Sequence, residues 1–215
     1  TDAGDVPRVL SADEQSRAAR FRSGELRRRF VGSRMVLRTI LGRCLGIAPD
    51  RVVFETDARG KPRLRHGSGL CFNLSHSADL MLLAVSGGVD LGVDLERIRP
   101  MNDALGIAQR FFTPREAVWL AEQERDDLDR TFFQLWTRKE AVLKATGRGI
   151  SHGLDAMEML TGEGVWRETV RVDGEPAASW WRLHELDPAR GFVGALAVPE
   201  EANVQGIRFS TWPDF

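Results

Sequence analysis

The chain has few lysines, few cysteines and no long apolar run. No stretch approaches the roughly 18–20 continuous apolar residues that a membrane-spanning helix needs. The N-terminus lacks the basic segment followed by an apolar segment that marks a secretory signal. The two cysteines, Cys44 and Cys71, lie among apolar residues, which favours a buried, reduced pair over a disulfide. From these absences we expect a cytoplasmic protein.

Net charge is also nearly absent. The formal net charge of −1 argues against general nucleic-acid binding. With 42% hydrophobic and 28% charged residues, the 215-residue chain is expected to be globular, as one large domain or as two small halves that share a core. The charge is uneven, since ten arginines accompany only three acids between Arg8 and Arg43. Such an excess is typical of a solvated helical face, and an anionic ligand or partner is the alternative.

Lysine is the rarer of the two basic residues. Of thirty basic side chains only three are lysines: Lys61, Lys139 and Lys144. Lysine offers a compact, rotatable charge that suits phosphate oxygens, whereas arginine offers a rigid fork. The three positions are therefore candidates for binding an anion, with chance retention as the alternative.

The residue pattern predicts an α+β fold. Ser11-Ala12-Asp13-Glu14 has the form of a helix-starting capping box, and Thr113-Pro114-Arg115-Glu116 starts another helix. The expected helices are 11–21, 23–44, 103–110, 113–124 and 127–146, and the expected strands are 51–55, 70–74, 80–85, 89–96, 156–160, 178–186, 192–198 and 206–210. Strand 70–74 is expected to break at Ser75, and strand 80–85 to be central and paired with 89–96 in a hairpin.

The two halves of the chain resemble each other faintly. Val36-Leu37-Arg38 with Gly42 in one long helix parallels Val142-Leu143-Lys144 with Gly147 in the other. A duplicated α+β unit is therefore conceivable, although the repeat is weak. We expect an N-terminal half at residues 1–100 and a C-terminal half at residues 101–215.

Asp94 and Glu96 lie two residues apart in a strand-like apolar run. Side chains of a strand alternate between its faces, so both carboxylates project to one side and Val93 and Leu95 to the other. Two carboxylates near a core repel each other unless a cation or hydrogen-bond donors compensate. A solvated strand face is the ordinary explanation of this pattern, and a cation site is the alternative.

Two further motifs contain residues suited to catalysis or anion binding. On a helix, Trp136, Glu140 and Lys144 lie on one face with Lys139 beside them; an ordinary surface pair of Glu and Lys is the simpler explanation. Ser75-His76-Ser77 places two hydroxyls and an imidazole at a strand end, which suits an anion, whereas a turn with a core histidine is equally compatible. A serine protease is disfavoured because adjacent Ser and His residues rarely reach the geometry of a nucleophile and its base.

These motifs occur in an order that resembles a known family, the Sfp-type 4′-phosphopantetheinyl transferases of the holo-carrier-protein synthase superfamily. The resemblance covers Arg17 to about Gly149. Each motif alone is weak, and the five in order are specific. They are Gly60-Lys61-Pro62, Phe72-Asn73-Leu74-Ser75-His76-Ser77, Gly92-Val93-Asp94-Leu95-Glu96, Phe111-Phe112 with Glu116, and Trp136-Thr137-Arg138-Lys139-Glu140-Ala141-Val142-Leu143-Lys144.

The resemblance implies two pseudo-symmetric α/β halves with the active site in the cleft between them. The enzyme would transfer phosphopantetheine from coenzyme A to a serine of an apo acyl or peptidyl carrier protein and release adenosine 3′,5′-bisphosphate. Carrier domains of polyketide and nonribosomal peptide synthases, in secondary-metabolite biosynthesis, would be its partners. No nucleic acid or membrane is expected as a partner, and the protein is expected to be a monomer.

The resemblance also implies roles for individual residues. Asp94, Glu96 and Glu140 would hold Mg²⁺ on the pyrophosphate, with Mn²⁺ as an alternative metal. Glu140, or a water that it orients, would be the base for the acceptor serine. Asp94 and Lys144 complete the catalytic set. Residues implied in binding coenzyme A are Arg17, Arg28, Lys61, Ser75, His76, Glu116, Lys139 and Lys144, with Ser75 and His76 near the 3′-phosphate; for Glu116 the capping box is an equally good explanation.

Two other functions fit parts of the pattern. A metal-dependent phosphohydrolase could use the same carboxylates on a pyrophosphate, but it would not need the motif from Trp136 to Lys144. A non-catalytic regulator that binds coenzyme A would not need three acids. Thr137 replaces the Ser or Cys that family members often have there and is expected only to pack. The region after Thr161 matches no motif of the family.

Overall fold

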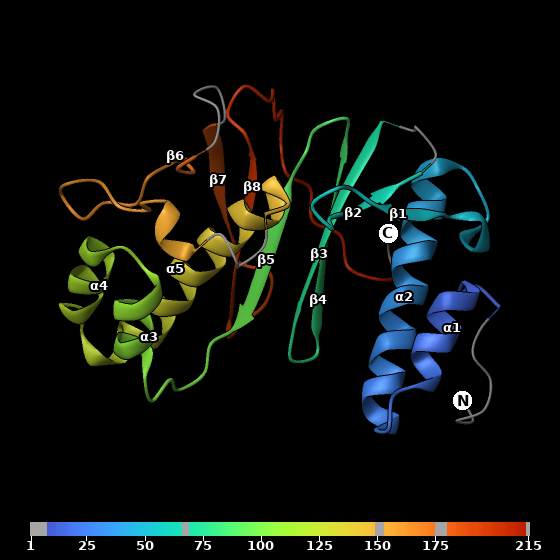
Figure 1. Ribbon diagram of the computed structural model, residues 1–215, viewed down its shortest axis with the longest axis horizontal. Helices are drawn as coiled ribbons and strands as arrows, with labels where there is room; N and C mark the ends of the chain where they lie inside the picture. Colours follow the sequence, from blue (N-terminus) through green and yellow to red (C-terminus); the bar gives the residue numbers. More distant parts are fainter. Residues whose placement is uncertain (1–7, 66–68, 149–152, 175–179, 214–215) are drawn as a thin grey trace. The chain divides into compact units, whose positions relative to one another are not determined.

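The computed structural model describes residues 8–65, 69–148, 153–174 and 180–213 (Figure 1). The described residues fall into two compact units that interleave along the chain. The first unit comprises the described residues of 1–55, 64–68 and 204–215, and the second those of 56–63 and 69–203. The α+β class is confirmed by this mixture of helices and antiparallel sheets. The expected boundary at residue 100 stays a prediction.

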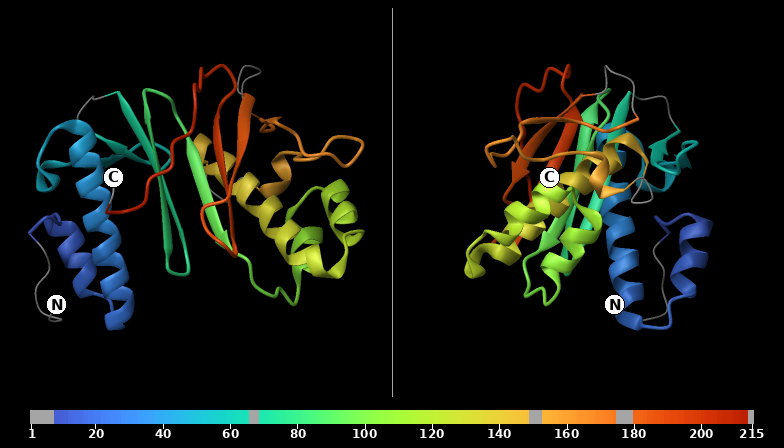
Figure 2. Two further views of the ribbon diagram at one scale, coloured as in Figure 1. Left: turned by 180° about the vertical axis from the view of Figure 1, so that it is seen from behind. Right: turned by 60° about the vertical axis from the view of Figure 1, so that its left-hand side comes forward.

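The first unit contains two capped helices that lie side by side in both views (Figure 2). α1 (Ala12–Ala19) begins with the predicted capping box, and α2 (Gly24–Leu45) begins at Ser23 and ends at Gly46 with a φ of 67°. A short 3₁₀ helix, Pro49–Arg51, follows. The buried carboxylate of Glu14 accepts hydrogen bonds from Arg34 at 2.5 Å and Arg38 at 2.6 Å. Part of the arginine excess therefore stabilises the unit itself.

The second unit is built on two antiparallel sheets. β3 (Leu70–Ser77) and β4 (Leu80–Gly87) form a hairpin that closes at the Ser77–Leu80 pair. The other sheet has the order β5-β8-β7-β6 in the described residues. Its strands are β5 (Gly92–Arg97), β8 (Phe192–Pro199), β7 (Trp180–Leu186) and β6 (Thr169–Arg171). β1 (Phe54–Thr56) and β2 (Pro62–Leu64) pair around the predicted turn, where the chain passes between the units.

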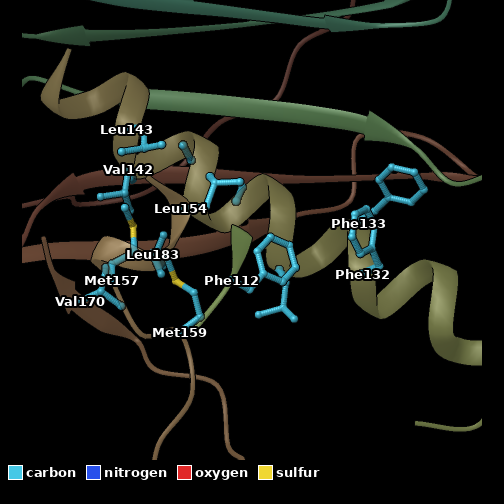
Figure 3. Close-up of a cluster of buried hydrophobic side chains, with 14 of the residues drawn as sticks. Phe112, Phe132, Phe133, Val142, Leu143, Leu154, Met157, Met159, Val170 and Leu183 are labelled. Atoms are coloured by element: carbon cyan, nitrogen blue, oxygen red, sulfur yellow. The ribbon is translucent and has the colours of Figure 1, made fainter. Parts of the chain in front are cut away.

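α5 (Arg125–Thr146) packs along one face of this four-stranded sheet (Figure 2). Its buried side chains meet those of α3 (Ala104–Phe111), α4 (Pro114–Ala121) and the sheet in one apolar cluster. Figure 3 shows part of this cluster, in which Phe112 and Phe132 stack with ring centroids 5.6 Å apart. The cluster also holds Val142, Leu143, Leu154, Met157, Met159, Val170 and Leu183. α5 is thereby fixed on the sheet that carries β5.

Most helix termini agree with the sequence predictions, whereas several strands do not. β3 continues through Ser77 instead of breaking at Ser75. The expected hairpin of 80–85 with 89–96 is wrong, because β4 pairs with β3 and β5 pairs with β8. Nor is β4 central, since its only strand partner in the described ranges is β3. These pairings depend on contacts that local sequence does not specify.

Smaller differences concern strand ends. In place of strand 51–55 the chain forms the 3₁₀ helix Pro49–Arg51 followed by β1, and in place of 156–160 it forms a 3₁₀ helix, Leu154–Ala156, and an isolated bridge of Leu160 with Trp166. Residues 206–210 form no strand, and β6 was not predicted. Residues 178 and 179 of the expected strand 178–186 lie outside the described residues.

The cysteines are free, as expected, although their burial differs from the prediction. Cys44 is exposed on α2 and Cys71 is half-buried on β3. None of the helices in the described ranges combines the length and the hydrophobicity that a membrane crossing requires.

Candidate active site

The site is organised around β5, whose side chains alternate as predicted. Val93 and Leu95 are buried on one face of the strand. Asp94 and Glu96 project from the other face, where Asp94 is 4% exposed and Glu96 is half-buried. Gly92 shares the face of Asp94, and there α5 comes so close that a Cβ on Gly92 would lie 2.1 Å from the Ala141 carbonyl oxygen. The carboxylates therefore face the same side as α5 and are not on a solvated strand face.

Three side chains of β3 form hydrogen bonds to β5. The Asn73 side-chain oxygen accepts a hydrogen bond from the backbone N–H of Val93 at 2.9 Å. Ser75 donates its hydroxyl to Asp94 at 2.8 Å. Ser77 donates to Glu96 at 2.7 Å. Because Asn73, Ser75 and Ser77 are spaced by two on a strand, all three meet β5 from one face of β3.

α5 contributes Glu140 and Lys144, one helical turn apart. The Lys144 ammonium donates to Asp94 Oδ1 at 2.6 Å and to the Ser75 hydroxyl at 3.0 Å. About a quarter of the Lys144 side chain is exposed, at 28%, whereas the Asp94 side chain is 6% exposed. Lys144 therefore reaches from solvent into the buried polar centre that Asp94 and Ser75 form.

The carboxyl groups interact electrostatically. Burial, and then the nearby charges of Asp94 and Glu96, raise the pKa of Glu140 to about 7, while the Lys144 ammonium acts in the opposite direction. Among the described residues, Asp94 Oδ2 and Glu140 Oε1 are buried oxygens without a hydrogen-bond partner. Buried carboxylate oxygens that lack donors and repel one another suit a hard divalent cation such as Mg²⁺.

The carboxylates of Asp94, Glu96 and Glu140 are the kind of ligand that Mg²⁺ prefers, but they are not arranged as a complete coordination site. Within the described ranges, no group of three or more His, Cys, Asp or Glu side chains is arranged as a metal-ion site. Lys144 instead supplies the positive charge next to Asp94. The expected metal ligands Asp94, Glu96 and Glu140 therefore stay a prediction, supported by the unpartnered oxygens.

The Lys61 ammonium is bound by oxygens of the protein itself. Its side chain is buried, and its ammonium donates to the carbonyl oxygens of Leu91 at 2.9 Å and Ala145 at 2.8 Å. A longer contact of 3.4 Å joins it to Asp90. Since an ammonium has three donors, all of them are used within the protein. The expected contact of Lys61 with a coenzyme A phosphate stays a prediction.

Lys139 and Glu116 form a fully buried ion pair rather than a phosphate site. Their charged atoms lie 2.7 Å apart, and both side chains are 0% exposed. Lys139 also donates to the carbonyl oxygens of Leu154 and Met157, both at 2.7 Å. Glu116 completes the capping box of α4, as the alternative explanation proposed. The geometry gives the pair a structural role, and the expected contact of Lys139 and Glu116 with coenzyme A stays a prediction.

The remaining predicted residues are distributed more widely. His76 is exposed and, by strand alternation, lies on the opposite face of β3 from Ser75. The expectation, from the family resemblance, that Ser75 and His76 lie near the 3′-phosphate stays a prediction. Arg17 and Arg28 are exposed residues of the first unit, on α1 and α2. Thr137 is buried and packs, as expected.

Sequence reasoning missed the polar face of β3. Asn73 and Ser77 were not proposed as site residues, yet they hold β5 at Val93 and Glu96. The signal was available, because polar residues at 73, 75 and 77 follow the period of two that a strand requires. The expected strand break concealed it.

Comparisons with known proteins agree with the motifs. A family model described as the 4′-phosphopantetheinyl transferase superfamily matches residues 90–197, and a second, described as the N-terminal part of a 4′-phosphopantetheinyl transferase, matches residues 4–87.

Three similar proteins span most of the chain. The 4′-phosphopantetheinyl transferase HetI of Nostoc sp. (strain PCC 7120) is 44% identical over 90% of this chain and 80% of its own length. The 4′-phosphopantetheinyl transferase psf-1 of Bacillus pumilus is 34% identical over 84% of this chain and 76% of its own. The 4′-phosphopantetheinyl transferase Sfp of Bacillus subtilis (strain 168) is 26% identical over 89% of this chain and 84% of its own.

Proposed function

The chain belongs to the 4′-phosphopantetheinyl transferase superfamily, and from this we propose that it moves 4′-phosphopantetheine from coenzyme A to a serine of an apo carrier protein. Members of the family transfer phosphopantetheine to carrier proteins. The proposed by-product is adenosine 3′,5′-bisphosphate. The observation that carries the proposal is the coincidence of the family match with a centre in which Lys144 contacts Asp94 beside Glu140.

We propose Asp94, Glu96 and Glu140 as the residues that hold Mg²⁺. When bound, the metal would neutralise charge that develops on the pyrophosphate during transfer. Ser75 and Ser77 support this assignment, because their hydroxyls orient the carboxylates of Asp94 and Glu96. Mg²⁺ and Mn²⁺ both accept carboxylate ligands, so the choice between them stays a prediction.

The protein's own groups have separate tasks in the proposed transfer. The serine oxygen of the carrier forms a bond to the phosphorus next to pantetheine, and the bond from that phosphorus to the bridging oxygen breaks. Glu140, or a water that it orients, takes the serine proton. Lys144 is partly exposed and supplies positive charge beside Asp94, where it can meet a phosphate oxygen. We propose no catalytic contact for Lys61 and Lys139, because their donors are used within the protein.

Intact-protein mass spectrometry of apo carrier proteins tests the proposal. After incubation with the protein, coenzyme A and Mg²⁺, we expect a carrier to gain the mass of one phosphopantetheine. Asp94→Asn and Glu140→Gln are expected to lower transfer by at least about 10²-fold, and Lys144→Ala by about tenfold or more. Glu122→Gln, at an exposed carboxylate, is the matched control and should transfer normally.

Absence of any mass gain on carriers of peptide, polyketide and fatty-acid type would contradict the proposed transfer. Normal turnover in Asp94→Asn or Glu140→Gln would instead contradict only the residue assignment. The natural carrier, the monomeric state and the cytoplasmic location stay predictions.

A further inference from the structure

Lys61 lies in the turn before β2 and ties together two elements that are distant in sequence. Its side chain is 5% exposed. Its ammonium contacts the Leu91 carbonyl, one residue before β5, and the Ala145 carbonyl in the last turn of α5. The third contact, to Asp90, is longer, and Asp90 is itself held by Arg63. The buried Lys61 ammonium therefore links the start of β5 to the end of α5.

The two elements that Lys61 joins carry the polar centre of the site. Ala145 directly follows Lys144, and Leu91 precedes Asp94 by three residues. Beside the tie, Gly92 lets the backbones of β5 and α5 meet, since a Cβ there would lie 2.3 Å from the Ala145 nitrogen. A change in the spacing of β5 and α5 at this point would therefore move the Lys144 ammonium relative to the Asp94 carboxylate, which are 2.6 Å apart.

We propose that Lys61 is a positioning residue, which holds the last turn of α5 on β5 and thereby places the Lys144 ammonium against Asp94. The inference rests on the proposed function only where it concerns the rate of transfer. The proposed role is to hold the two elements together, because the three donors of Lys61 point to protein oxygens.

The geometry of these contacts explains why lysine occurs here in a chain whose basic residues are mostly arginines. The carbonyl groups in the last turn of a helix lack partners within the helix, and a cation at that end is favourable. A single ammonium can donate to two carbonyl oxygens and a carboxylate from one point, whereas the planar guanidinium group is larger and rigid. Lys61→Arg therefore keeps the charge but is not expected to restore the contacts.

Kinetics of four variants test the proposal. We expect Lys61→Met to lower kcat by roughly tenfold, because small displacements of a positioning group are costly, with a smaller effect on KM for coenzyme A. In a Lys144→Met background, Lys61→Met should lower kcat by less than about twofold, since the effects of residues that act through one another are not additive. Arg59→Met is the matched control: Arg59 also donates to the last turn of α5, at Thr146, but from an exposed position. It should change kcat by less than about twofold.

A spectroscopic readout makes the test independent of transfer. Since the chain contains only three lysines, labelling with ¹³C-lysine yields three ε-methylene signals. Lys61→Met should shift the Lys144 signal and leave the Lys139 signal in place, whether or not the protein transfers phosphopantetheine. A wild type that modifies no carrier would refute the proposed function, whereas the lysine signals would still decide the role of Lys61.

Two outcomes would overturn the inference. One is a folded Lys61→Met protein with an unmoved Lys144 signal, and the other is a kcat loss equally large with and without Lys144. If Lys61→Met does not fold, Asp90→Asn weakens the same tie from a half-exposed side chain. It should shift the Lys144 signal in the same direction by a smaller amount, and an unmoved signal there also overturns the inference.

Discussion

Glu140 is a residue whose ionisation should be measurable in the stability of the protein. Its carboxyl pKa is raised from an ordinary value of 4.5 to about 7, by burial and then by the charges of Asp94 and Glu96. Between these two values the folded state binds more protons than the unfolded chain does. Stability contributed by the neutral carboxyl is therefore full below the unfolded pKa and is lost as pH rises through the folded pKa.

Glu140→Gln should imitate the neutral carboxyl at every pH. In the absence of metal we expect the variant to be more stable than the wild type by on the order of 1–2 kcal/mol near pH 8, since one pKa unit corresponds to about 1.4 kcal/mol and solvent screens part of the effect. The difference should shrink toward zero near pH 4.5. Urea unfolding with a chelator present measures both values. The prediction fails if Glu140→Gln and the exposed-site control Glu122→Gln show the same pH dependence.

Side-chain alternation predicted the carboxylate face of the site, whereas lysine usage did not predict that Lys61 and Lys139 are buried. Asp94 and Glu96 lie on one face because period two is a property of any strand, and a strand was expected there. Lys61 and Lys139 were expected to bind phosphate because lysine suits phosphate. In the structure their ammonium groups donate to backbone carbonyls, and the phosphate contacts stay predictions. Residue type indicates what a side chain can bind, whereas burial depends on packing from distant parts of the chain.

The close contact between β5 and α5 depends on Gly92, which has no side chain. At Gly92 an added Cβ would lie 2.1 Å from the Ala141 carbonyl oxygen and 2.3 Å from the Ala145 nitrogen, and both are backbone atoms that cannot rotate away. We expect Gly92→Ala to destabilise the protein by about 2–3 kcal/mol or more, because overpacking forces the backbone to shift. Transfer should fall by at least about tenfold, since α5 carries Glu140 and Lys144. Chemical denaturation and the carrier assay measure these effects.

Gly32→Ala is the matched control for this prediction. Gly32 lies inside α2, and apart from its own helix backbone and chain neighbours no atom of the described residues lies within 4 Å of an added Cβ. Alanine there should stabilise the protein by about 0.5–1 kcal/mol, through helix propensity alone. If Gly92→Ala were as well tolerated as Gly32→Ala, the close approach of β5 and α5 would not exist in solution.

Helices were more predictable than strand pairing because their signals are local. The capping boxes at Ser11 and Thr113 and the left-handed cap at Gly46 were readable over a few residues. The partner of a strand is set by residues far away: β5 pairs with β8, about a hundred residues later in the chain. The region after Thr161, which matched no family motif, thus supports the strand that carries Asp94.

At the scale of the molecule, the order of the motifs predicted the family better than any single motif did. Two family models match residues 4–87 and 90–197 and so divide the chain into two parts. The α+β class and the family were predictable because the motifs occur in sequence order. The contacts made by Ser75 and Lys61 were not predictable in the same way, because they join segments that the motif pattern treats as separate.

A bound divalent cation should change the stability of the whole protein, because a ligand that binds only the folded state stabilises it by mass action. At about pH 8 we expect about 10 mM Mg²⁺ to raise the apparent melting temperature by about 2–4 °C. The physical reason is that the cation would relieve the repulsion that raises the Glu140 pKa. Near pH 5.5 the shift should be smaller, since protons compete for the same carboxylates. Calorimetry at matched ionic strength measures it, and Asp94→Asn should abolish it; an equal shift in wild type and Asp94→Asn would place the cation elsewhere.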